Sequence, residues 1–252
     1  MESNLKTDYL KKSLGNMGIR IGEDGANDFV RFHKFLAYWN SKLNLTAVTD
    51  WEESVERHYL DSASISLGYP FEAQLNHNDV KVLDVGSGAG FPGIPLKILF
   101  PKIQLTLLDS VNKKTDFLVR VVCHLGLDLT CVETERAEIL ARNDTHRGAY
   151  DLVLARAVSK LNVLAELTIP FCKVGGLVIA MKGKSVGSEI ATSSKAITAL
   201  GGEVVDVIDC NGIHRFLKGY LVVLKKVLPT PAKFPRRPGI PLKRPLSGGR
   251  GK

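Results

Sequence analysis

Apolar positions follow two different periods along this chain. Over the first 70 residues they recur at the three- and four-residue spacing of an amphipathic helix. The clearest examples are Phe29, Phe32, Phe35, Leu36 and Trp39. A second amphipathic stretch runs over 51–67, and Pro70 and the polar stretch 76–79 then break the pattern. These positions predict a helical cap over residues 1–72.

From Val80 onward, short apolar runs alternate with helical patterns, as in βαβ units. The predicted strands are 80–85, 103–109, 129–133, 151–155, 176–181, 203–209 and 219–226, with helices near 92–100, 113–125, 160–171 and 187–200. This alternation predicts a mainly parallel sheet with helices on both faces. Only residues 211–218 join the last two strands, so these should form an antiparallel pair. An α/β sheet over 73–228 that ends in such a hairpin resembles the Rossmann-like fold of class I methyltransferases.

Composition narrows the class of protein. The 252 residues are 44% hydrophobic, but no apolar run approaches the roughly 20 residues that cross a bilayer, and the first residues do not resemble a signal peptide. We therefore expect a soluble, cytoplasmic protein that does not bind membranes. The four cysteines form no C-x-x-C pair and have no histidine at metal-ligand spacing, so we expect no metal site. Cys123, Cys131, Cys172 and Cys210 are interpreted as small core residues in a reducing compartment.

The net charge of +8 is concentrated at one end of the chain. Residues 210–252 hold eleven Lys or Arg and no acid, which leaves 23 basic and 26 acidic residues in the first 209. Residues 229–252, the C-terminal arm, are also rich in proline, so we expect an extended segment and not a packed element. Clustered cations favour a phosphate backbone, although a solvated tail is the alternative. The candidate RNA-binding residues are Lys233, Arg236, Arg237, Lys243 and Arg244. Deleting the arm should then weaken RNA binding and leave cofactor affinity nearly intact.

A glycine-rich loop follows the strand at 80–85 and indicates a nucleoside cofactor. The dinucleotide pattern G-x-G-x-x-G matches at Gly88, Gly90 and Gly93, and Pro92 is well placed to begin a helix. However, a carboxylate at Asp84 would repel a pyrophosphate, whereas it can hold the methionine ammonium of S-adenosylmethionine. Asp84 therefore favours S-adenosylmethionine, and a turn-capping role is the alternative.

Further candidates follow the next strands, whose ends should share one edge of the sheet. Asp109 ends the second strand and can bind the ribose hydroxyls of either cofactor class. The segment 135–138 could border an adenine. Arg156 could place a cation beside the methionine carboxylate or an incoming nucleotide, and surface ion pairs are the alternative for both segments.

Seven segments together resemble the small-subunit ribosomal RNA guanine-N7 methyltransferase family, RsmG or GidB. They are 39–46, 57–62, 84–95, 108–110, 136–138, 156–157 and the start of the arm from Lys233. The run Gly-Phe-Pro-Gly-Ile-Pro over 90–95 is far more specific than a generic glycine loop. Asp116 departs from a segment that is often basic in relatives, so RNA contact is not expected there.

The resemblance implies S-adenosyl-L-methionine as the cofactor, with Gly86 and Phe91 contacting it, Ala137 and Glu138 near the adenine, and Arg156 closing the site. The general fold argument adds Asp84, Gly88 and Asp109 to the cofactor set. The implied substrate is N7 of a guanosine in 16S rRNA, free or in an assembling small subunit, and a monomer is expected.

Guanine N7 has a free lone pair and no proton, so positioning should dominate and no catalytic base is assigned. His58 and His214 therefore receive no catalytic role. The alternatives are another RNA methyltransferase, a nucleotide-cofactor oxidoreductase on the same scaffold, or a non-catalytic RNA-binding protein.

Overall fold

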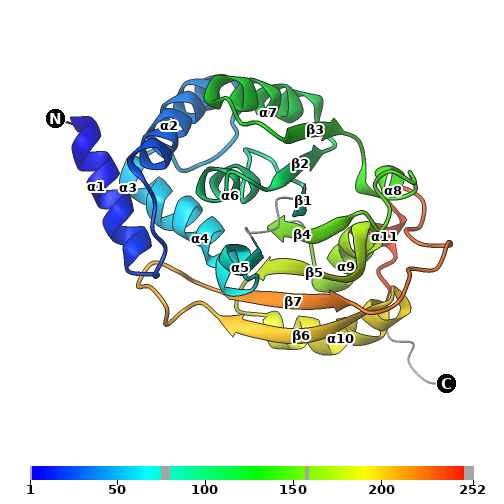
Figure 1. Ribbon diagram of the computed structural model, residues 1–252. Helices are drawn as coiled ribbons and strands as arrows, with labels where there is room; N and C mark the ends of the chain where they lie inside the picture. Colours follow the sequence, from blue (N-terminus) through cyan, green and yellow to red (C-terminus); the bar gives the residue numbers. More distant parts are fainter. Residues whose placement is uncertain (1, 75–79, 157–158, 247–252) are drawn as a thin grey trace.

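A computed structural model describes residues 2–74, 80–156 and 159–246 as a seven-stranded sheet wrapped by helices (Figure 1). The strands are β1 (Lys81–Val85), β2 (Gln104–Asp109), β3 (Thr130–Thr134), β4 (Tyr150–Arg156), β5 (Cys172–Lys182), β6 (Gly202–Asp209) and β7 (Tyr220–Lys226). Their order is β3-β2-β1-β4-β5-β7-β6. The first five are parallel to one another, and β7 is antiparallel to both β5 and β6. The predicted fold class and the antiparallel pair are confirmed.

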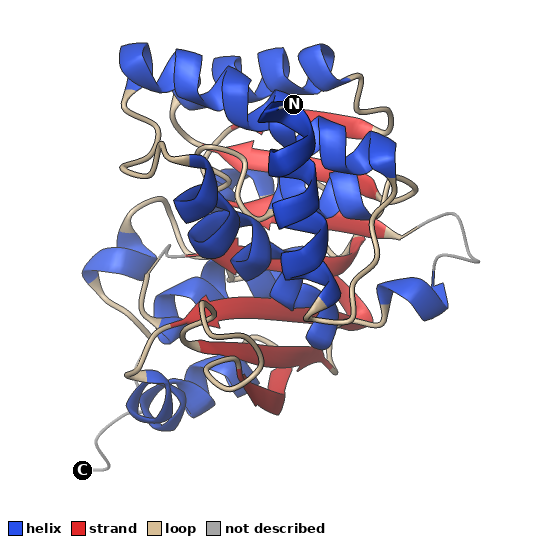
Figure 2. Ribbon diagram, turned by 90° about the vertical axis from the view of Figure 1, so that its left-hand side faces the viewer, coloured by secondary structure: helices blue, strands red, loops and turns tan. Residues whose placement is uncertain are grey.

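The helices form two layers, one on each face of the sheet. The N-terminal helices are α1 (Glu2–Gly15), α2 (Glu23–Leu43), α3 (Trp51–Ser54), a π-helix (Val55–Tyr59), α4 (Leu60–Ala63), a 3-10 turn (Ser64–Leu67) and α5 (Phe71–Gln74). Figure 2 shows this group in front of the sheet, where α2 and α4 contact α6 (Gly93–Leu99) and α2 also contacts α7 (Asn112–Leu125). The remaining helices are α8 (Ala137–Leu140), α9 (Leu161–Thr168), a 3-10 turn (Ile169–Phe171), α10 (Val186–Ala199) and α11 (Ile240–Lys243).

The cap, residues 1–72, shares one apolar core with the sheet. The regular spacing seen in the sequence buries Phe29, Phe32 and Leu36 of α2 against α6, α7 and the strands. Phe91 of the glycine loop belongs to the same core, with ring centres 5.6 Å from Phe32 and 6.1 Å from Tyr59. The other face of the sheet has its own core, formed with α9 and α10. The cap therefore packs continuously against the glycine loop.

The prediction for the cysteines is wrong at two of the four positions. Cys172 and Cys210 are buried as expected, whereas Cys123 and Cys131 are exposed. Cys123 lies on the outer side of α7, and Cys131 lies on β3, the edge strand, where burial is incomplete. Apolar neighbours in the sequence therefore did not reveal which side of each element faces solvent.

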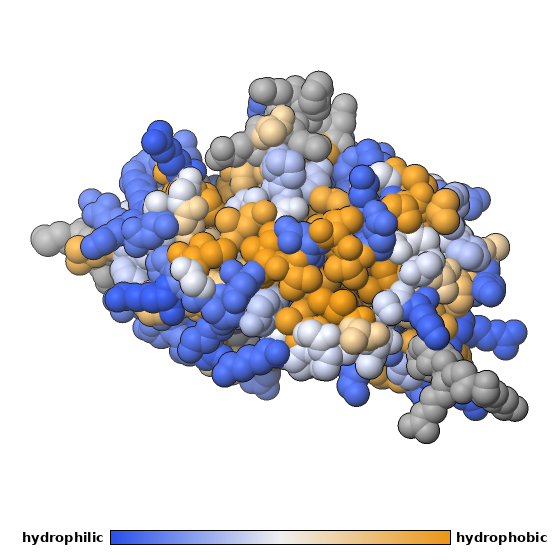
Figure 3. All heavy atoms as spheres, turned by 90° about the horizontal axis from the view of Figure 1, so that it is seen from below, coloured by the Kyte–Doolittle hydropathy of each residue, from blue (hydrophilic) through white to orange (hydrophobic). Residues whose placement is uncertain are grey.

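The second sheet edge, β6, leaves apolar side chains at the surface. Val205 and Val207 are 46% and 38% exposed. Figure 3, seen from the side where β6 and α10 lie in Figure 1, shows apolar atoms gathered over the middle of this face. No helix among the described residues has an apolar stretch long enough to cross a bilayer.

Candidate cofactor site

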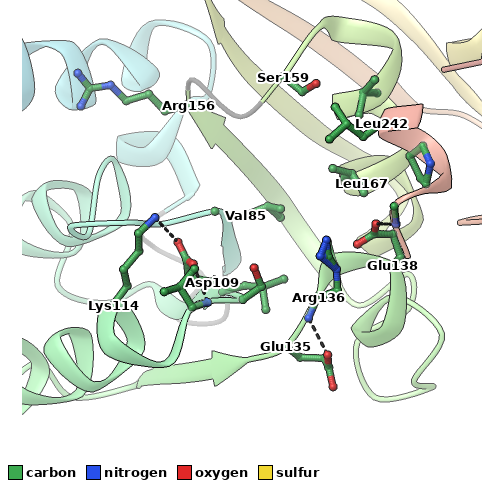
Figure 4. A pocket seen from close by; sticks show the side chains of 18 residues that line it. Val85, Asp109, Lys114, Glu135, Arg136, Glu138, Arg156, Ser159, Leu167 and Leu242 are labelled. Atoms are coloured by element: carbon green, nitrogen blue, oxygen red, sulfur yellow. Dashed lines mark hydrogen bonds and ion pairs between the residues drawn. The ribbon is translucent and has the colours of Figure 1, made fainter. Parts of the chain in front are cut away.

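A cavity of about 370 Å³ opens at the carboxyl ends of the parallel strands (Figure 4). Because all these strands run in the same direction, their ends bring residues distant in sequence to one edge of the sheet. At β1, β2 and the start of α7 the lining residues are Val85, Gly86, Leu108, Asp109, Ser110, Val111 and Lys114. The cavity is lined beyond β3 and β4 by Glu135, Arg136, Ala137, Glu138, Arg156, Ser159, Val163 and Leu167, and from the arm by Gly239, Pro241 and Leu242.

The glycine loop borders the cavity beside β1 through Gly86. Gly86, Gly88 and Gly90 have φ angles of +76°, +57° and +92°, a region that side chains with a Cβ rarely adopt. A Cβ on Gly90 would lie 2.6 Å from Ile94 Cγ1, and one on Gly93 would lie 2.5 Å from Leu107 Cδ2. These glycines allow the loop to turn tightly against α6 and β2.

Asp109 connects the loop to the cavity wall. Its Oδ2 accepts a hydrogen bond from the Gly88 amide at 3.0 Å, and its Oδ1 accepts one from the Val111 amide at 3.0 Å. Lys114 Nζ lies 3.6 Å from Oδ2. The carboxylate therefore orients the loop and remains on the cavity wall at the position predicted for a ribose-binding acid.

Asp84 lies below the loop and not on the cavity wall. It is fully buried, and its Oδ2 accepts a hydrogen bond from the Gly93 amide at 3.0 Å. Its Oδ1 has no hydrogen-bond partner among the described residues. The structure thus does not bring Asp84 to the cavity, and the contact that it does show supports the start of α6.

Burial raises the pKa of Asp84 to about 7, although the Gly93 amide opposes the rise. Because the unfolded-state pKa is about 4, the folded protein retains a proton between about pH 4 and 7 that the unfolded chain has lost. The free energy of unfolding should therefore fall as pH rises through that window. In Asp84→Asn this decline should be clearly smaller, as measured by urea unfolding at several pH values. An identical pH dependence in the two proteins would contradict the assignment.

Ala137 and Glu138 lie together in α8, on the far side of the cavity from the loop. Glu138 is 8% exposed, and its Oε1 accepts a hydrogen bond from the Gly239 amide of the arm at 2.8 Å. In Figure 4, Glu138, Leu167 and Leu242 lie on the side of the cavity opposite Lys114. The segment predicted to border an adenine therefore lines the cavity, and the arm packs beside it.

The expectation of an extended arm is wrong for its described part, residues 229–246. Phe234 is buried, and Arg147 donates hydrogen bonds to the Thr230 and Phe234 carbonyl oxygens at 2.9 Å each. Arg236 Nε and Nη2 donate to Glu166, whose side chain is 0% exposed, at 2.9 and 2.6 Å. In a free arm these groups would be hydrogen-bonded to water. Here they are hydrogen-bonded to residues distant in the sequence, so the arm is packed against the protein.

The arm contributes both to the cavity and to the surface. Gly239, Pro241 and Leu242 line the cavity, so the expectation that deleting the arm spares cofactor affinity does not fit this structure. Of the five candidate RNA-binding cations, Arg236 is paired with Glu166, and its charge is compensated. The other four, Lys233, Arg237, Lys243 and Arg244, are exposed, and their contact with RNA stays a prediction.

Phe91 and His58 lie between the cap and the sheet. Phe91 is 8% exposed, does not line the cavity, and packs against the His58 ring with centres 4.4 Å apart. His58 Nε2 lies 3.0 Å from Thr46 Oγ1, and burial lowers the pKa of His58 to about 4. The structure thus gives Phe91 a packing role and keeps His58 neutral. His214 lies apart from this site, on the loop between β6 and β7.

Arg156 joins β4 to the cap. Its Nε lies 3.0 Å from Asp61 Oδ2, and its Nη2 donates to the Arg57 carbonyl at 2.7 Å. Figure 4 shows its guanidinium pointing away from the other labelled residues, toward the cap helices. The observed partner of Arg156 is thus a carboxylate of this chain, as in the ion-pair alternative, and its contact with the methionine carboxylate stays a prediction. Ala157, which the resemblance also marked, lies outside the described residues.

The residues present fit a nucleoside cofactor. A tight glycine turn, a carboxylate at the end of β2 and a mixed apolar and polar wall beyond β3 surround one cavity. Among the described residues, no group of three or more His, Cys, Asp or Glu side chains could hold a metal ion.

A protein-family model described as rRNA small subunit methyltransferase G, GidB, matches residues 26–217. The chain belongs to this family. A ribosomal RNA small subunit methyltransferase G from Alkaliphilus metalliredigens is 42% identical over 246 residues, covering 98% of this chain and 100% of the relative. One from Roseiflexus castenholzii is 41% identical, covering 95% of this chain and 99% of the relative. The resemblance seen in the sequence is confirmed, and this GidB chain is a ribosomal RNA methyltransferase.

Solved structures agree on the fold of this GidB chain. A mutant of MtNAS in complex with S-adenosylmethionine aligns with a TM-score of 0.52 at 13% identity, over 79% of this chain and 75% of that one. A putative sarcosine dimethylglycine methyltransferase from Galdieria sulphuraria aligns with a TM-score of 0.50 at 12% identity, over 71% and 88%. The Rossmann-like class I methyltransferase fold is therefore confirmed.

Sequence reasoning missed three groups in this GidB site. Gly239, Pro241 and Leu242 line the cavity, although nothing in a basic, proline-rich segment indicates a cavity wall. Glu166 lies in α9 and Arg147 in the loop before β4, and nothing in their sequence context indicates that they hold the arm. Asp61, the partner of Arg156, lies in the segment 57–62 that carries the resemblance, but nothing in that segment indicates this ion pair.

Proposed function

We propose that this GidB chain transfers a methyl group from S-adenosylmethionine to N7 of a guanosine in 16S rRNA. The observation that supports it most is the cavity in which Gly86, Asp109, Ala137, Glu138 and Arg156 meet, because these are cofactor residues that the family resemblance and the fold argument predict. The proposal includes 16S rRNA, free or in an assembling small subunit, as the substrate, and a single chain as the active unit.

In this mechanism the side chains position the reactants. S-adenosylmethionine supplies a methyl group on a positively charged sulfur. Gly86 of the loop, Asp109 and the α8 segment would hold its amino-acid, ribose and adenine parts. Asp109 and Glu138 already accept hydrogen bonds from backbone amides, so both act as fixed acceptors. Guanine N7 has no proton to lose, and alignment of the two reactants within the site is the main contribution expected of the protein.

Methyl mapping tests the proposal. The purified protein, with S-adenosylmethionine, should add one N7-methylguanosine to small subunits from cells that lack the gene, detected by mass spectrometry of nuclease fragments. A semi-synthetic RNA with 7-deazaguanosine at that position lacks the N7 lone pair and should accept no methyl group. Methylation of the deaza RNA, or of another atom, would overturn the assignment. Calorimetry should show binding of S-adenosylhomocysteine and none of nicotinamide dinucleotides, and the reverse would favour the oxidoreductase.

Exposed cations of the arm should bind RNA phosphates. Replacing both Lys243 and Arg244 with Gln should make the plot of log affinity against log salt shallower by roughly 1.4, since each phosphate contact to single-stranded RNA contributes about 0.7. The matched control replaces Lys81 and Lys102 with Gln. These exposed cations lie at the amino ends of β1 and β2, at the sheet edge away from the cavity, and their replacement should leave the slope unchanged. Equal slopes for both double variants would show that Lys243 and Arg244 do not contact RNA phosphates.

A further inference from the structure

A second cavity, of about 280 Å³, adjoins the cofactor cavity through Arg156, which lines both. It lies where β5 ends and β7 begins, and α4 of the cap borders it through Asp61. Its lining residues are Asp61, Arg156, Met181, Lys182, Gly183, Cys210, Lys218, Tyr220 and Leu221. This placement puts a separate compartment directly beside the proposed methyl donor.

The lining combines the surfaces that a nucleotide needs. Met181, Leu221 and the ring of Tyr220 offer an apolar wall to a flat base. Lys218 is exposed at the rim, where it can meet a phosphate. Lys182 is already paired, since its Nζ lies 2.7 Å from Glu189 Oε2, so it shapes the cavity without bringing an uncompensated charge.

Among the described residues that line this cavity, Asp61 is the only one with a carboxylate. Arg156 holds its Oδ2 at 3.0 Å, and no described residue donates a hydrogen bond to its Oδ1. Its side chain is 25% exposed, so one carboxylate edge remains available to a ligand. The π-helix Val55–Tyr59 ends two residues before Asp61. Such helices are rare in proteins, and those that occur are often found at functional sites.

A fixed carboxylate distinguishes guanine from the other bases. Guanine presents two adjacent donors, N1–H and the N2 amino group, which match the two oxygens of a carboxylate. Adenine, cytosine and uracil each present an acceptor at one of the corresponding positions. N7 lies on the opposite edge of the purine, so a guanine held through N1 and N2 keeps N7 free to react.

We propose that the second cavity receives the guanine to be methylated. In this arrangement Asp61 selects guanine over the other bases, because its carboxylate accepts hydrogen bonds from N1–H and the N2 amino group of guanine. This inference rests on the proposed function. Arg156 acts here as a positioning residue, because it holds Asp61 at the boundary of the two cavities.

Inosine tests the role of Asp61, because it keeps N7 but lacks the N2 amino group. For the wild-type protein, inosine at the target position should lower kcat/KM about 10-fold or more, as expected for a lost hydrogen bond to a charged group. In Asp61→Asn, the rate on guanosine should fall by a similar factor, and the guanosine-to-inosine ratio should shrink to below about 3-fold. Asp116→Asn, at an exposed position on α7 outside both cavities, should keep the wild-type ratio. Affinity for S-adenosylhomocysteine should not change in either variant.

Equal rates on the two RNAs for the wild-type protein, or a wild-type ratio in Asp61→Asn, would overturn the role of Asp61. For a variant too slow to assay, equilibrium binding of the two RNAs in the presence of S-adenosylhomocysteine gives the same ratio. A wild-type protein that methylates no guanosine N7 would overturn the proposed function and this inference with it. By contrast, N7 methylation with no discrimination against inosine removes only the inference.

Discussion

Arg236→Ala should lower the free energy of unfolding by about 3–5 kcal/mol, because removing one partner of a buried ion pair leaves the other charge uncompensated. The partner that remains, Glu166, is 0% exposed and accepts three side-chain hydrogen bonds from Arg236. Urea unfolding followed by circular dichroism measures the change.

Two controls separate this ion pair from the general effect of charge. Arg237→Ala removes the neighbouring, exposed cation and should change stability by no more than about 0.5 kcal/mol. Combining Arg236→Ala with Glu166→Leu removes both charges and should recover part of the loss. A change below about 1 kcal/mol in Arg236→Ala would show that the arm does not depend on this pair.

A chain that ends at Pro238 should bind S-adenosylhomocysteine about 10-fold more weakly than the full chain. It keeps Phe234 and Arg236, which anchor the arm, but loses Gly239, Pro241 and Leu242 from the cavity wall. Losing about 50 Å² of apolar contact corresponds to roughly 1.3 kcal/mol, or tenfold in affinity. Isothermal titration calorimetry measures this difference.

The matched control ends at Leu246 and keeps every described arm residue that lines the cavity. Its affinity for S-adenosylhomocysteine should equal that of the full chain. If both truncated chains bind as tightly as the full chain, the arm wall does not contact the cofactor, and the original expectation of unchanged affinity is restored.

The strands and the edge of the site could be predicted from the sequence because they depend on local patterns. Buried parallel strands appear as short apolar runs, and their ends necessarily converge, which is why Gly86, Asp109 and Glu138 line one cavity. The packing of the arm could not be predicted in this way. It depends on the pairing of Arg236 with Glu166, 70 residues away, which composition does not reveal.

The direction of a side chain within the loop was likewise hidden. Asp84 and Phe91 stand beside the glycines in sequence, yet both point into the protein and not into the cavity. Three positive φ angles, at Gly86, Gly88 and Gly90, determine the path of this loop. Sequence spacing identifies such a loop but does not say which of its side chains face the ligand.

Phe91 belongs to the glycine loop, but its ring packs against Phe32 and Tyr59 of the cap. Because close-packed side chains share no spare volume, an altered ring at Phe91 needs a compensating change in the cap rings that it contacts. A chimera that joins this cap to the sheet of a distant methyltransferase would have to carry the matching loop residue. The boundary near residue 72 divides two sequence patterns, but it does not divide two interchangeable modules.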